Sequence, residues 1–312
     1  MSLFARWSKP ETDTARWLVD DACLQLIHQA ATANTAPSLV IQREVQQVLL
    51  GERQSAFAGS GYEFAENVAL HSGDDARFIN WRLFARTGEY YRKAFYEERR
   101  PQVWLVLDRG PHMCFGTHTR LKLALAAQLA LLHLFVAQRQ QLLTGAVLLQ
   151  GQAEWLRPAQ GHAAVHNLIY KLRQPCPPPG ERDTSHALPS LLAQLNVRLR
   201  PGCIVILYSD FQNLQGADMN RLHALSEQHS VLARHIVDRS ELELPAAGQY
   251  HFAAQQIEQT VDCTDGALRE QYRQAMAQRH AQVRDWLQQA GCDYQRYTAD
   301  ADLFTPQAIR HA

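Results

Sequence analysis

The sequence predicts an α/β protein built on an open, mostly parallel sheet with helices on both faces. Three observations lead to this fold class. Apolar runs of strand length alternate with helical segments, several of these runs end on an aspartate, and the longest helical segment is rich in leucine and alanine. Alternating strands and helices are typical of parallel sheets, in which polar sites lie at the carboxyl ends of the strands. We therefore expect a polar crevice along that edge.

The alternation begins at Val103. The apolar run 103–107 predicts a central strand that ends at Asp108, and the segment 117–141, which contains neither Gly nor Pro, predicts a long helix. Two further strand-like runs, 142–149 and 153–156, follow at the spacing of a hairpin. The remaining expected elements are helices at 162–173, 185–197 and 267–290, and strands at 203–208, 230–237 and 293–297.

Residues 1–100 differ from the rest of the chain in composition and in the pattern of apolar residues. Residues 13–30 predict a helix, 40–50 fit either a helix or a strand, and 51–100 are punctuated by glycine and rich in aromatic and charged residues. We therefore predict a smaller N-terminal lobe over 1–100 and an α/β domain over 101–312, both within the usual size range of domains.

Composition limits the classes of partner. Lys and Arg total 31 among 312 residues and Asp and Glu also total 31, so the formal net charge is zero. A neutral chain has no overall field to hold a nucleic acid, and we expect no nucleic-acid partner. The six cysteines lie far apart without a C-x-x-C pair, which argues against structural zinc and is typical of reduced thiols.

The sequence also lacks signals for export and nucleotide hydrolysis. Its first residues contain no apolar core of signal-peptide length, which predicts a cytoplasmic location by default. The apolar segment 121–137 is interrupted by Lys122, Gln128 and His133, so we expect a buried helix and no transmembrane segment. No G-x-x-x-x-G-K motif is present, so we do not expect the chain to hydrolyse nucleotide itself.

A long motif resembles a known family. Residues 73–81 read GDDARFINW and 85–88 read ARTG; EER follows at 97–99, and DRSELELP at 238–245. This pattern resembles the bacterial "domain of unknown function 58" family over about residues 62 to 303. The resemblance implies a von Willebrand A-like fold. It also implies an adaptor or co-chaperone role beside an AAA+ ATPase of the MoxR type, sometimes with a metal involved.

The von Willebrand A resemblance also implies a divalent-cation site. Asp108 would be the first ligand, but Gly110 and His112 stand where two serines belong, whereas Thr184 and Asp210 match the later threonine and aspartate. Glycine offers no side-chain oxygen and imidazole is softer than Mg²⁺ prefers, so we expect a degenerate site without tight magnesium binding. Two alternatives remain: a borderline metal such as Zn²⁺, or carboxylates satisfied by neighbouring backbone N–H groups.

The charged motif between residues 74 and 100 has two interpretations. Seven Arg and Lys side chains alternate with five Asp and Glu side chains, with aromatic residues between them. In the first interpretation, arginine–carboxylate pairs within an aromatic layer form an internal clamp that fastens the N-terminal lobe to the sheet. In the second, arginines and aromatic residues face outward and form a docking surface for a partner. The residues expected to take part are Asp74, Asp75, Arg77, Trp81, Arg86, Glu97 and Glu98.

Together these observations favour a non-catalytic adaptor that binds a MoxR-type AAA+ ATPase, client proteins or both. The strand scaffold is intact whereas the metal-ligand set is incomplete. The alternative is a metal-dependent hydrolase that uses Asp108, Asp210 and His112 in the crevice. Because no nucleophile, base and orienting group can be assembled from spacing, we expect no catalytic residues and no certain cofactor.

Overall fold

The computed structural model describes residues 17–32, 58–59, 63–70, 77, 79–96, 101–176, 187–254, 257–301 and 303. Its main feature is a six-stranded sheet in the order β11-β8-β7-β4-β5-β6. Adjacent strands are parallel except β6, which pairs antiparallel with β5. The predicted open, mostly parallel α/β sheet is therefore confirmed. The strands are β4 (Val103–Asp108), β5 (Thr144–Gln150), β6 (Gln152–Ala159), β7 (Ile204–Ser209), β8 (Ser230–Val237) and β11 (Asp293–Thr298).

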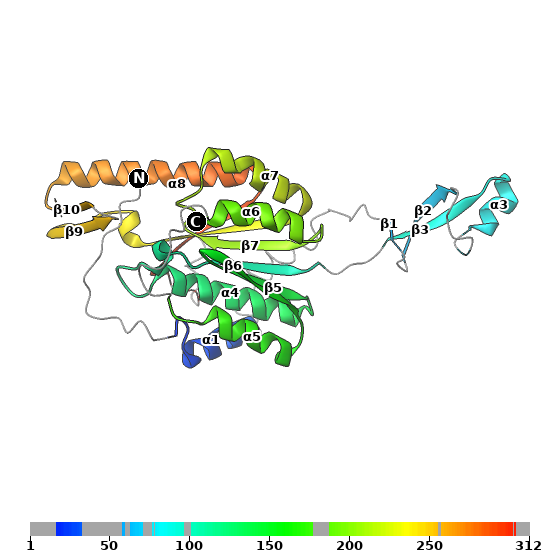
Figure 1. Ribbon diagram of the computed structural model, residues 1–312, viewed down its shortest axis with the longest axis horizontal. Coiled ribbons are helices and arrows are strands. Elements are labelled where there is room, and N and C mark those ends of the chain that lie inside the picture. The colour runs from blue at the N-terminus through cyan, green and yellow to red at the C-terminus, as the bar shows by residue number, and fades with distance from the viewer. Residues whose placement is uncertain are drawn as a thin grey trace. The chain divides into compact units, whose positions relative to one another are not determined.

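Helices cover both faces of this sheet, as Figure 1 shows. Successive side chains of a strand point to opposite faces, so Leu105 and Ile206 belong to one core whereas Val106 and Val205 belong to the other. The first core is covered by α1 (Asp21–Thr32), α4 (Lys122–Arg139) and α5 (His162–Leu172), and the second by α6 (Ala187–Arg198), α7 (Met219–Gln228) and α8 (Gly266–Gln289).

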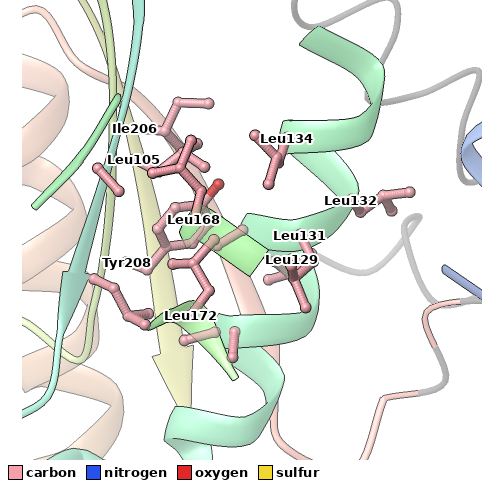
Figure 2. Packing of buried hydrophobic residues seen from close by; sticks show 14 of the residues in the cluster. Leu105, Leu129, Leu131, Leu132, Leu134, Leu168, Leu172, Ile206 and Tyr208 are labelled. Carbon is pink, nitrogen blue, oxygen red and sulfur yellow. The ribbon is translucent and has the colours of Figure 1, made fainter. Parts of the chain in front are cut away.

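The first core surrounds α4, which is buried on nearly all sides. Figure 2 shows Leu129 and Leu131 of this helix in the same cluster of buried side chains as Leu105 of β4 and Leu168 of α5. The polar residue His133 is accommodated here because its Nδ1 lies 2.9 Å from the Tyr208 hydroxyl. None of the described helices combines the length and the apolar character needed to cross a bilayer.

Several element boundaries differ from the predicted ones. The long helix begins at Lys122 rather than at 117, because the amide and hydroxyl of Thr117 donate hydrogen bonds to Asp238 and hold that segment as a loop. The first helix begins at Asp21, because the carboxylate of Asp20 accepts the Cys23 N–H at 2.7 Å and caps it. The helix α7 and an antiparallel hairpin of β9 (Gln249–Ala254) and β10 (Ile257–Asp262) were not predicted from the sequence.

A second unit covers part of the residues before β4. The described residues of this unit form a three-stranded antiparallel sheet in the order β1-β3-β2 and one helix. The helix α3 (Trp81–Thr87) starts after Asn80, whose side chain accepts the Leu83 N–H at 3.2 Å, and stops at Gly88, whose φ is 76°. The motif letters N-W and A-R-T-G therefore mark the two ends of a short helix. The strands are β1 (Ala58–Gly59), β2 (Glu63–Ala69) and β3 (Tyr91–Tyr96).

The chain divides into two compact units, Met1–Leu49 with Gln102–Ala312, and Leu50–Pro101. This division corrects the predicted lobe over residues 1–100. The helix α1 belongs to the larger unit, because Ile27 and Ala31 on its apolar face are part of the core around α4. Residues 40–50, which fit either helix or strand, lie outside the described residues.

Candidate functional site

The carboxyl ends of three neighbouring strands each carry an aspartate. Asp108 is the last residue of β4, and Asp210 and Asp238 are the first residues after β7 and β8. All three are buried. Because these strands are adjacent and parallel, the three carboxylates lie along the same edge of the sheet.

Asp108 is held by hydrogen bonds from three groups of the chain. Its Oδ1 accepts the Gly110 N–H at 3.0 Å, and its Oδ2 accepts the Ser209 hydroxyl at 2.6 Å. The Nε2 of His112 lies 3.2 Å from the same Oδ2. Burial alone would raise the pKa of Asp108, but attraction to His112 and the hydrogen bonds from His112, Ser209 and Gly110 outweigh it and lower that pKa. Asp108 is therefore an ionised carboxylate whose oxygens are already bound.

Asp210 is paired with two cationic side chains. Nζ of Lys122 donates to Oδ2 at 2.7 Å, and Nε2 of His112 lies 3.5 Å from Oδ1. Lys122 is fully buried at the start of α4, where it also donates to Oε1 of Glu241 at 2.6 Å. One ammonium group therefore joins the loop after β7, the loop after β8 and the first turn of α4.

The loop after β8 completes this network. The turn η4 (Arg239–Glu241) is closed by a reciprocal cap, in which Asp238 accepts the Ser240 N–H and Glu241 Oε2 accepts the Asp238 N–H at 2.8 Å. Asp238 also accepts the amide of Thr117 at 2.9 Å, so this loop holds the segment that precedes α4. Every strand-end aspartate therefore links its own loop to another segment of the chain.

The charges of the cluster nearly balance. Burial would lower the pKa of His112, but attraction to Asp210 and then Asp108 raises it to about 9, so the imidazole is protonated at neutral pH. Burial likewise opposes the charge of Lys122, yet Asp210 and Glu241 raise the pKa of its ammonium. The carboxyl group of Glu241 has its pKa raised by burial and by Asp210. Lys122 and His112 thus face the ionised carboxylates of Asp108 and Asp210 and the more readily protonated Glu241, whereas Asp238 is held by hydrogen bonds from Thr117 and Ser240.

Gly110 and His112 form a matched pair in this loop, which continues into the turn η2 (Pro111–Cys114). The imidazole ring of His112 folds back over Gly110: a Cβ at position 110 would overlap this ring and lie 2.8 Å from its Nδ1. A serine at position 110 is therefore incompatible with the present position of His112. Gly110 and His112 stand where the von Willebrand A pattern has serines. The two residues depend on each other, because the imidazole occupies the space that a side chain at position 110 would fill.

These residues do not fit a divalent metal ion. The carboxylate oxygens of Asp108 and Asp210 are taken by His112, Lys122, Ser209 and backbone amides, and a protonated imidazole is not a metal ligand. Across the described part of the chain, no group of three His, Cys, Asp or Glu side chains has the arrangement of a metal site. The expected ligand Thr184 lies outside the described residues.

We predict that the protein is insensitive to divalent metal. Because Lys122 and His112 supply the positive charge between the carboxylates, millimolar Mg²⁺ is expected to shift the melting temperature by less than about 1 °C, as for a ligand without a native-state site. Differential scanning fluorimetry with Mg²⁺, Zn²⁺ or EDTA measures this. A rise of several degrees with Mg²⁺ that EDTA reverses would show that a metal site exists.

The structure describes only part of the charged motif. Trp81 and Arg86 lie on α3 and are exposed, and Arg77 is exposed shortly before it. Asp74, Asp75, Glu97 and Glu98 lie outside the described residues, so the arginine–carboxylate clamp is not tested by this structure.

Three members of the site were not predicted from the sequence: Lys122, Ser209 and Glu241. Lys122 was visible as a single cation at the head of an otherwise apolar helix, a position that burial permits only with a partner. Glu241 was visible through the D-x-x-E spacing from Asp238, which is a capping pattern. Ser209, beside Asp210, carried no distinct signal.

Comparison with known proteins places the chain in a family. The family model described as "Protein of unknown function DUF58" matches residues 69–282, which include α3, the strand-end aspartates and most of α8. The chain belongs to the DUF58 family. The resemblance that the motif indicated is therefore confirmed, whereas the family description assigns no activity to this DUF58 protein.

The proteins similar to this DUF58 protein include a mycobacterial relative and two solved structures. It is 29% identical to "Uncharacterized protein Rv1480" of Mycobacterium tuberculosis over 280 residues, which cover 87% of this chain and 86% of the relative. Among solved structures, "conserved hypothetical protein BatB" from Bacteroides thetaiotaomicron is 15% identical with a TM-score of 0.39, over 64% of this chain and 90% of that one. An "aerotolerance-related membrane protein" from Bacteroides fragilis is 13% identical with a TM-score of 0.38, over 67% and 96%.

These structures correct one prediction about the DUF58 protein. A cytoplasmic location was predicted from the first residues of the sequence, whereas the Bacteroides fragilis structure is described as that of a membrane protein. The cytoplasmic prediction is contradicted and is not retained. Its physical basis was weak, because the lack of a leader in a sequence says little about where a folded chain is held.

Proposed function

We propose that this DUF58 protein is a non-catalytic adaptor or co-chaperone-like protein that works with a MoxR-type AAA+ ATPase through protein–protein contacts on a von Willebrand A-like scaffold. The observation that carries the proposal is that Lys122 and His112 already bind the strand-end carboxylates. A metal-dependent hydrolase would need Asp108 and Asp210 to hold a metal ion or to accept a proton from water. Here the same oxygens hold loops together, which favours recognition over turnover.

The partner ATPase is inferred from the family resemblance, and the structure adds a candidate docking surface. Trp81 and Tyr90 are 60% and 50% exposed, and Phe84 lies between them with its ring stacked on Tyr90 at 4.3 Å between centroids. Arg82 and Arg86 are exposed on the same short helix. Trp, Tyr and Arg are the side chains most enriched at binding hot spots. We call these five residues the aromatic–arginine cluster. We expect the cluster to bind a partner surface whose apolar centre is surrounded by acidic residues.

We expect Trp81→Ala to weaken binding of the ATPase by at least about 30-fold, which corresponds to a hot-spot loss of about 2 kcal/mol. The melting temperature should stay nearly unchanged, because most of the Trp81 side chain is exposed. The measurement is a pull-down of the MoxR-type ATPase of the same organism, followed by calorimetric titration, with ATP, with ADP and without nucleotide.

Val197→Ala is the matched control. Val197 is an 85% exposed apolar side chain on α6, remote in sequence from the aromatic–arginine cluster, so its removal should leave binding unchanged. Equal binding by the Trp81→Ala variant would exclude the cluster as the docking surface. Failure of the wild-type chain to bind the ATPase in every nucleotide state would contradict the proposed function itself.

A further inference from the structure

The buried Lys and Arg side chains of the described residues are Arg109, Lys122 and Arg234. Lys122 donates to two carboxylates, and Arg234 lies 2.8 Å from the carboxylate of Asp293. Arg109 is only 4% exposed, and its hydrogen bonds in the described part of the chain go to carbonyl oxygens and to no carboxylate. Because Lys and Arg are almost never fully buried without a counter-charge, Arg109 marks a place where an anion is expected.

The carbonyl groups hold the Arg109 side chain in place without neutralising it. Its Nη atoms donate to the backbone oxygens of Lys171 at 3.2 Å, Gln174 at 3.3 Å and Pro175 at 2.6 Å, at the end of α5 and just after it. A guanidinium has five N–H donors, and Nε of Arg109 is buried with no hydrogen-bond partner in the described structure. Burial lowers the pKa of Arg109, as expected of a cation that no ion pair stabilises.

Arg109 lines a pocket of about 320 Å³ at the turn between β5 and β6. The other lining residues belong to β5, to β6 and to the segment after α5: Leu148, Gln150, Gln152, Ala153, Glu154 and Gln174. Gln150, Gln152 and Glu154 are exposed whereas Arg109 is buried, so Arg109 forms the inner part of the pocket and polar side chains surround its opening. The volume lies within the range of small-ligand sites. We call this site the Arg109 pocket.

The charges around the Arg109 pocket leave one positive charge unmatched. Oε1 of Glu154 lies 2.6 Å from Nζ of Lys171, so these two side chains balance each other. A monoanion would therefore neutralise the charge of Arg109, whereas a dianion such as phosphate would place a second negative charge beside Glu154. The glutamine side chains of the pocket both donate and accept hydrogen bonds, which suits the amide groups of a peptide.

We propose that the Arg109 pocket binds a carboxylate group, with the guanidinium of Arg109 as the charge that recognises it. The carboxylate belongs either to an acidic side chain of a peptide or to a small free acid, and both present the same monoanion. Arg109 follows Asp108 in the chain, but the lining of the pocket includes none of the strand-end aspartates. The site is therefore separate from the network around Asp108, and the proposal does not depend on the ATPase partner.

The test is calorimetric titration of the full-length protein with four probes: an acetylated, amidated tripeptide with a central glutamate between glycines, the same tripeptide with glutamine, propionate, and inorganic phosphate. We expect the glutamate peptide to bind at least about tenfold more tightly than the glutamine peptide, as for a charge-assisted hydrogen bond. A glutamate peptide that binds at least about tenfold more tightly than propionate assigns the pocket to acidic peptides, and a smaller difference assigns it to small free acids.

Three results of the titration would overturn the proposal. The first is that neither the glutamate peptide nor propionate binds. The second is that the glutamine peptide binds as tightly as the glutamate peptide, because the carboxylate would then contribute nothing. The third is that phosphate binds more tightly than both carboxylate probes, because the charge of the pocket would then not select a monoanion.

Two variants place the binding in the Arg109 pocket. Arg109→Met should weaken binding of the glutamate peptide at least about tenfold. Because Arg109 also holds three carbonyl oxygens, this variant is checked for native circular dichroism, and Glu154→Gln provides a test that does not disturb the core. The Glu154 side chain is 47% exposed, and removal of its negative charge should tighten binding about two- to fivefold.

Glu270→Gln is the matched control. The Glu270 side chain is 48% exposed and lies 2.6 Å from Arg273, as Glu154 lies from Lys171, but Glu270 is on α8 and does not line the pocket. Its removal should leave the affinity unchanged. If Glu154→Gln fails to tighten binding, or if Glu270→Gln tightens it equally, the carboxylate does not bind in the Arg109 pocket and the proposal is wrong.

Discussion

Replacing Lys122 by methionine is expected to lower the free energy of unfolding by about 3–5 kcal/mol, the cost typical of leaving buried charges without their partner. Methionine preserves much of the length of the side chain, so the loss is chiefly electrostatic. The variant would leave Asp210 and Glu241 facing each other inside the protein without the ammonium group that lies 2.7 Å and 2.6 Å from them. Urea unfolding followed by circular dichroism measures the change.

A surface pair provides the comparison. Lys171 and Glu154 are 2.6 Å apart, but their side chains are 27% and 47% exposed, so Lys171→Met should cost less than about 1 kcal/mol. Adding Glu241→Gln to Lys122→Met should recover part of the lost stability, because one uncompensated charge disappears. Equal losses for the two methionine variants, or no recovery in the double variant, would show that Lys122 is not the charge that holds the site.

Stability is expected to fall by about 3 kcal/mol as the pH rises from 6.5 to above 9, through deprotonation of His112. Its pKa in the folded protein is raised to about 9 from an ordinary value of 6.5, through its contacts with Asp210 and Asp108. A group whose pKa is higher in the folded state binds its proton more tightly there. Its contribution is therefore complete below about pH 6.5 and is lost as the pH passes 9.

His112→Gln isolates this contribution from other titrations. The variant should be about 3 kcal/mol less stable than the wild type near pH 6.5, and the difference should vanish above pH 9. The buried His229, His235 and His280 act in the opposite sense: burial lowers their pKa values, so they reduce stability only as the pH falls below the ordinary range. A wild-type profile parallel to that of the variant from pH 6.5 to 9 would contradict the role of His112.

These two predictions describe one property of the site. The loops after β4, β7 and β8 are joined by Asp108, Asp210 and Asp238, and the charge between them is supplied by Lys122 and His112 of the same chain. A chelator removes the ion that holds a metal site together. The contacts of this site are instead broken only by mutation or by titration of His112. The carboxyl edge of the sheet is thus held together by side chains and backbone amides of the chain itself.

The strands of the main sheet and most of the helices that cover it were predictable, because the pattern of apolar residues in each element matches its burial. β4 and β7 are buried on both faces and read as continuous apolar runs, and α4 is buried on nearly all sides and reads as an apolar helix without a polar face. The helix α7 and the β9–β10 hairpin were missed. The sequence of α7 is mostly polar, with only Leu222, Leu225 and Ser226 buried, so its periodicity is faint.

The amino-acid sequence by itself determined the parallel α/β scaffold, the family and the place of Asp108 and Asp210 at strand ends, because these depend on local patterns of apolar and polar residues. Only the tertiary structure decided that Lys122 and His112 neutralise those carboxylates and that α1 belongs to the main unit. Both depend on segments distant in the chain, and the pairing of a buried charge is set by the packing that brings its partner within hydrogen-bonding distance.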